Sequence, residues 1–143
     1  MPNDTVKLLK ACNAGCKTAT NCMEQVRPHI RDEAFGDVLE DYDERHAAFG
    51  EEFERLLKEE GSAERDPKPA VRKMARLGTG MHLMLDDSTG GIAEMLMNGT
   101  YRGIKSVSEY CNRYRAASAD ATRLAHRLIE TEECFMKELR PYL

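Results

Sequence analysis

The stretch Leu39-Glu-Asp-Tyr-Asp-Glu-Arg-His46-Ala-Ala-Phe-Gly-Glu-Glu-Phe53 decides the fold. Its apolar and aromatic side chains recur at alternating steps of three and four residues, which places them on one face of an α-helix. We expect that face to be buried, with a histidine in its middle. Its members are Leu39, Tyr42, His46, Phe49, Phe53 and, beyond the quoted stretch, Leu56.

Asp43 lies three residues before His46, so both side chains can point toward the same place. A carboxylate and an imidazole at this spacing, directed into a helical core, are typical of metal sites in helical bundles. The core polar groups of a folded protein also commonly satisfy one another. His46 is therefore either a metal ligand or a buried histidine that is hydrogen-bonded to Tyr42 or Asp43.

The same periodicity recurs along most of the chain and predicts an all-α protein with a single domain, residues 1–143. Polar caps, glycines and prolines mark the ends of the helices. Near residue 118 we expect either a break or a kink within one helix of about 40 residues. The predicted helices cover residues 4–26, from between Pro28 and Asp32 to about Glu60, from Asp66–Pro67 to about Leu85, from about 89 to 116, and from Ser118 or Asp120 to about Arg140.

The predicted buried faces of three other helices contain unusual residues. Cys12 and Cys16 lie on that of the first helix, and Gly99 and Gly103 would let a bulky neighbour approach the fourth. The last helix has one glutamate, Glu132, amid an otherwise apolar face. A buried, unpaired carboxylate costs several kcal/mol, so Glu132 needs a cation, a partner or a proton. Its face comprises Ala121, Ala125, Leu128, Glu132, Phe135 and Leu139.

Three segments carry a resemblance to a known group of proteins. The chain is similar to the ferritin-like superfamily, and most to its small bacterial members of the stress-protein and spore-coat type. The resemblance implies an antiparallel four-helix bundle, with a fifth short helix or a kinked last helix. The segments are Asp43-Glu-Arg-His46, Gly99-Thr-Tyr-Arg-Gly103-Ile104 and Leu128-Ile-Glu-Thr-Glu-Glu-Cys-Phe-Met-Lys-Glu-Leu-Arg-Pro-Tyr-Leu143.

The resemblance also implies a metal site between the helices, for which we predict the ligands Asp43, His46 and Glu132, with iron or another transition metal as the cofactor. Such sites take a glutamate from each of two helices and Glu-x-x-His from each of the other two. In this chain, aspartate replaces glutamate at position 43, and Phe135 stands at the position of the second histidine. The alternative is a non-catalytic structural or protein-interaction bundle without metal. The sequence identifies no reaction.

Composition excludes several other classes of protein. The formal net charge of −4 gives no electrostatic reason to expect nucleic acid as a partner. No apolar run approaches the ~20 residues that span a bilayer, so we expect no membrane association. The first residues lack the basic residues followed by an apolar run that mark a secretion signal, which favours a cytoplasmic protein.

The five cysteines are an odd number in a chain expected to be cytoplasmic, so we predict reduced thiols that are mostly buried. We also predict a homodimer, since a small bundle with glycine-rich helix faces and eight methionines can bury the remaining apolar surface against a second copy.

Overall fold

The computed structural model describes residues 3–62 and 78–143, and every secondary-structure element in these two ranges is helical. This confirms the all-α prediction. Two single turns of 3-10 helix follow α1 and α5, and residues 78–85 are also helical. The elements are α1 (Asp4–Val26), η1 (Arg27–His29), α2 (Glu33–Glu59), α4 (Thr89–Arg113), α5 (Ala119–Leu139) and η2 (Arg140–Tyr142).

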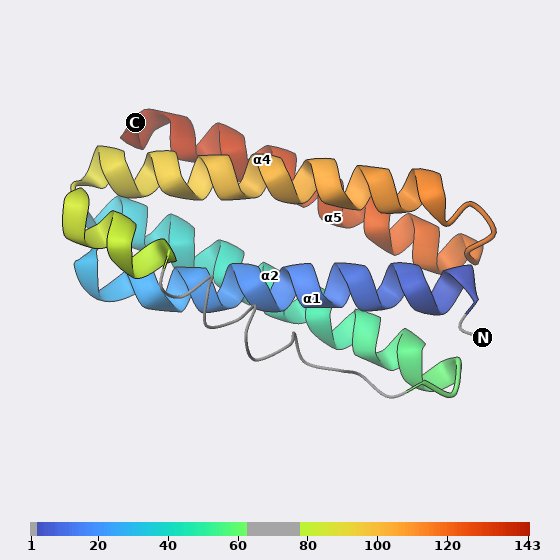
Figure 1. Ribbon diagram of the computed structural model, residues 1–143. Coiled ribbons are helices and arrows are strands. Elements are labelled where there is room, and N and C mark those ends of the chain that lie inside the picture. Colours follow the sequence, from blue (N-terminus) through green and yellow to red (C-terminus); the bar gives the residue numbers. More distant parts are fainter. Residues whose placement is uncertain (1–2, 63–77) are drawn as a thin grey trace.

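The four long helices lie side by side with roughly aligned axes (Figure 1). α1 and α2 run in opposite directions, and so do α4 and α5, which a turn at residues 114–118 connects. α2 and α4 run in the same direction, so the end of α2 and the start of α4 lie at opposite ends of the molecule.

Local signals in the sequence explain where the helices begin and end. Each long helix follows a polar residue whose side chain accepts a hydrogen bond from the backbone N–H three positions later. α2 ends before Gly61, whose φ of 72° is a left-handed conformation that suits a residue without Cβ. The four cap residues are Asn3, Asp32, Ser88 and Ser118.

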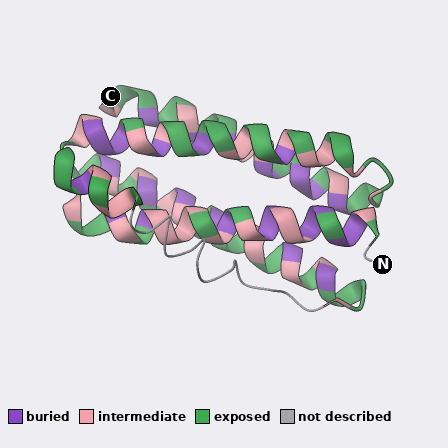
Figure 2. Cartoon of the chain, viewed as in Figure 1, coloured by how far each residue is buried: buried purple, intermediate pink, exposed green. Residues whose placement is uncertain are grey.

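The interior consists of two apolar clusters, and buried residues lie on the faces that the helices turn toward one another (Figure 2). We call them the Phe53 cluster and the Phe35 cluster. The Phe53 cluster contains Val6, Leu8, Leu9, Cys12, Cys16, Phe53, Leu57, Val107, Ala121, Leu124, Ala125 and Leu128. The Phe35 cluster contains Met23, Val26, Phe35, Leu39, Tyr42, Leu83, Ile92, Ala93, Leu96, Phe135 and Leu139.

The buried side chains of His46 and Glu132 separate the two clusters. Along α2, His46 lies after Tyr42 of the Phe35 cluster and before Phe53 of the other. Along α5, Glu132 likewise lies between one cluster and the next. The core of the bundle is therefore interrupted near its middle by a polar pair.

Most sequence predictions of helix ends are close to the observed ones. The break near residue 118 is a true reversal of the chain, not a kink, because residues 114–118 are not helical and α5 turns back along α4. The predicted third helix ends at Leu85 as expected. Its portion from Asp66 to residue 77 lies outside the described residues.

One glycine prediction is confirmed and another is wrong. Gly103 lies against Glu132, so the expected close approach of a larger neighbour occurs there. Gly99 is exposed, with no heavy atom of a neighbour within 4 Å of a Cβ built on it. The reason is that 100° of rotation per residue carries position 99 off the buried face, which instead includes Leu96 and Thr100.

No helix among the described residues is both long enough and apolar enough to cross a membrane.

Two glycines of α4 make a matched pair for a stability test. A Cβ on Gly91 would lie between 2.3 and 2.5 Å from the carboxyl atoms of Asp86, which accepts a hydrogen bond from the N–H of Ser88. We expect Gly91→Ala to lower the free energy of unfolding by about 1 kcal/mol through loss of this turn. Gly99→Ala should raise it by about 0.5–1 kcal/mol, since alanine favours an exposed helix interior.

Urea unfolding of the two variants measures both changes. An equal gain in stability from the two substitutions would contradict the role of the Asp86 turn.

Candidate functional site

His46 and Glu132 face each other across the centre of the bundle. Nε2 of His46 in α2 is hydrogen-bonded to Oε1 of Glu132 in α5. The other ring nitrogen, Nδ1, lies 2.6 Å from the backbone carbonyl of Tyr42, one turn earlier in α2. A carbonyl can only accept, so Nδ1 carries a proton and donates it. Both nitrogens of the imidazole are therefore engaged.

The side chains around this pair shape the space that it occupies. Oε2 of Glu132 lies 3.6 Å from the position of a Cβ on Gly103, an ordinary van der Waals distance, so α4 packs directly against the carboxylate at this glycine. Phe135 stacks on Tyr42, with ring centroids 4.5 Å apart, and meets the edge of His46 at 6.2 Å. An aromatic ring thus fills the position where the ferritin-like resemblance would place a second histidine.

The environment of His46 favours its protonated form. Burial by itself would lower the pKa of His46, but the hydrogen bond and charge of Glu132, the Tyr42 carbonyl and the charge of Asp43 together raise it above 6.5. Only 2 % of the His46 side chain and 10 % of the Glu132 side chain are exposed. The site is therefore a histidine–glutamate hydrogen bond that is held away from water.

Asp43 lies beside the pair but binds elsewhere. Its carboxylate accepts a hydrogen bond from the guanidinium of Arg27 at 3.1 Å. Burial raises the pKa of Asp43, Arg27 opposes this shift, and the neighbouring Glu24 adds to it. The structure thus brings all three predicted ligands into one region, but joins only His46 and Glu132 directly.

The present geometry does not fit a metal ion. Within residues 3–62 and 78–143, no group of three or more histidine, cysteine, aspartate and glutamate side chains is arranged so that it could hold one. His46 and Glu132 supply two donor groups, and the third predicted ligand, Asp43, is turned toward Arg27.

All five cysteines are free thiols, as predicted. Cys12 and Cys16 are buried, Cys22 and Cys111 are partly buried and Cys134 is exposed, so the prediction that most of the thiols are buried is wrong. Burial and the nearby Cys111 raise the pKa of Cys12 to about 12, and burial likewise raises the pKa of Cys16. These thiols are protonated at neutral pH, so they pack as small apolar side chains and are poor nucleophiles.

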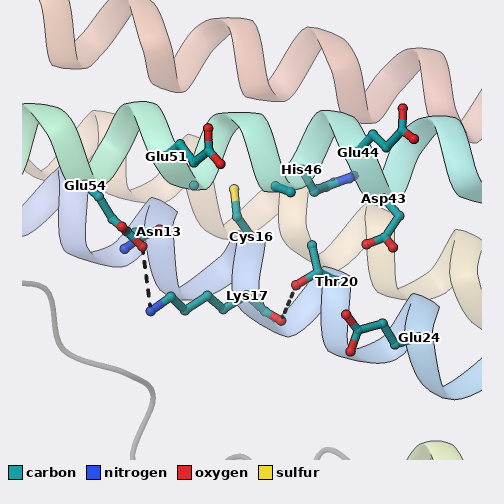
Figure 3. A pocket seen from close by; sticks show the side chains of 12 residues that line it. Asn13, Cys16, Lys17, Thr20, Glu24, Asp43, Glu44, His46, Glu51 and Glu54 are labelled. Carbon is teal, nitrogen blue, oxygen red and sulfur yellow. Dashed lines mark hydrogen bonds and ion pairs between the residues drawn. The ribbon is translucent and has the colours of Figure 1, made fainter.

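A groove of about 330 Å³, which no sequence pattern predicted, lies between α1 and α2 on the outer side of His46 (Figure 3). Five carboxylates line it. The glutamates at helix surface positions look like ordinary solvated residues in the sequence, and only the pairing of α1 with α2 gathers them. The carboxylates are Glu24, Asp43, Glu44, Glu51 and Glu54.

Asn13 also lines this groove, and no pattern in the sequence indicated it as a site residue. It is 2 % exposed, and its Oδ1 is the one buried side-chain nitrogen or oxygen atom without a hydrogen-bond partner among the described residues. The signal in the sequence that could have identified Asn13 was its position on the predicted helix, next to the buried face.

Comparison of the chain with protein families, with curated proteins and with solved structures gives no match. The ferritin-like resemblance therefore stays an expectation that rests on the segments quoted above.

The pair predicts strong coupling between two substitutions. His46→Leu or Glu132→Leu alone leaves a buried charged partner, and each should lower the free energy of unfolding by about 3–5 kcal/mol. The double variant should lose much less than the sum, with a coupling energy of about 2 kcal/mol or more. Denaturant unfolding of the four proteins of the cycle gives this energy. Additive losses would contradict the direct contact.

The raised pKa of His46 predicts how stability depends on pH. Between the unfolded pKa, about 6.5, and the higher folded value, the folded protein binds more protons than the unfolded chain. The contribution of His46 is therefore complete below about pH 6.5 and is lost as the pH rises through the folded pKa. The stability difference between wild type and His46→Gln should shrink over that range.

Thermal unfolding at a series of pH values measures this difference. His126→Gln, at an exposed position of α5, is the matched control for loss of a histidine. A difference that grows with rising pH would show that the imidazolium is not the stabilised form.

Proposed function

We propose that this protein is a non-catalytic helical bundle that acts by binding, and that His46 and Glu132 serve its architecture. The single observation that carries the proposal is the double engagement of His46. Nδ1 donates to the Tyr42 carbonyl and Nε2 bonds to Glu132, so neither nitrogen is available to a substrate. A general base or nucleophile-activating histidine needs a nitrogen that can reach the reacting group.

The thiols support the same proposal. A catalytic cysteine requires a lowered pKa and access to substrate. Burial raises the pKa values of Cys12, Cys16 and Cys22 instead. These three side chains belong to the interior of the bundle or to its margin.

The course of the chain supports a ferritin-like arrangement. Four long helices in which the second and third run in the same direction require one long crossover connection. Ferritin-like bundles differ from simple up-and-down bundles by one such crossover. We propose this fold family for the chain on the direction of its helices and the quoted sequence segments.

Metal binding is the second candidate function, and one observation favours it. Metal-binding histidines usually donate their second ring nitrogen to a carbonyl or carboxylate, which orients the ring. Nδ1 of His46 makes such a bond to the Tyr42 carbonyl. Binding would require a metal to replace the proton between His46 and Glu132, and Asp43 to leave Arg27.

Elemental analysis separates the two candidates. Protein from cells grown with iron, and purified without chelators, should contain far less than one equivalent of any transition metal. Added Fe²⁺, Mn²⁺ or Zn²⁺ should leave the melting temperature unchanged. About one equivalent of metal in wild type and in His126→Ala, but not in His46→Ala, would establish the metal site and overturn the architectural role.

The homodimer predicted from the sequence stays a prediction. Its support is apolar surface on the helical residues 78–85, where Met81, Met84 and Leu85 are 64 %, 88 % and 86 % exposed. Methionines adapt to many partner surfaces, so this helix is a suitable contact for a second copy.

A further inference from the structure

We draw no further inference here: the strongest candidate, the apolar face that Met81, Met84 and Leu85 expose on the helical residues 78–85, carries none because nothing among the described residues shows what covers it.

Discussion

The hydrogen bond between His46 and Glu132 is the interaction on which the rest of the structure depends. It lies between the Phe53 cluster and the Phe35 cluster, and joins α2 to α5 across the bundle. Charged groups in such a place are expensive to bury, and their pairing offsets the cost only when the geometry is good. The Tyr42 carbonyl orients the imidazole on one side of the pair, and α4 packs against the carboxylate at Gly103 on the other.

The pair also limits how the helices can slide past one another. An apolar face accepts a shift of one turn, because one aliphatic side chain can replace another at similar volume. A shift of α5 along α2 would instead leave His46 and Glu132 each buried without a partner. In bundles and coiled coils, one buried polar contact of this kind can fix the register of the helices. We infer the same role here, since the pair is central and flanked by apolar layers.

The sequence predicted the helices well because their signals are local. Caps such as Asn3 and Ser118 and the period of the apolar residues depend only on neighbours along the chain. The approach of His46 to Glu132 was also predictable, since each is the one charged residue on a face that must be buried. The set of side chains around His46 was harder to predict. Asp43 turns to Arg27, which belongs to a 3-10 turn without any periodic signal.

The groove could not be predicted from the sequence for a related reason. Its carboxylates lie on two helices, and their surroundings depend on the rotation of each helix about its axis, which the apolar period fixes only within a fraction of a turn. The same uncertainty made Gly99 an incorrect prediction, although Gly103 in the same helix was correct. Asn13 was overlooked because a polar residue next to Cys12 is usually assigned to the helix surface, whereas both are buried.

The protonation of the two nitrogens of the His46 ring is the most direct measure of the buried pair. In ¹⁵N-labelled protein, nuclear magnetic resonance reports the protonation of each imidazole nitrogen. We expect a slowly exchanging proton on Nδ1 at every pH at which the protein is folded, and a proton on Nε2 that is retained above pH 6.5 and that shifts in Glu132→Gln. A His46 ring with a rapidly exchanging Nδ1 proton, or with a titration unaffected by Glu132→Gln, would contradict the buried pair.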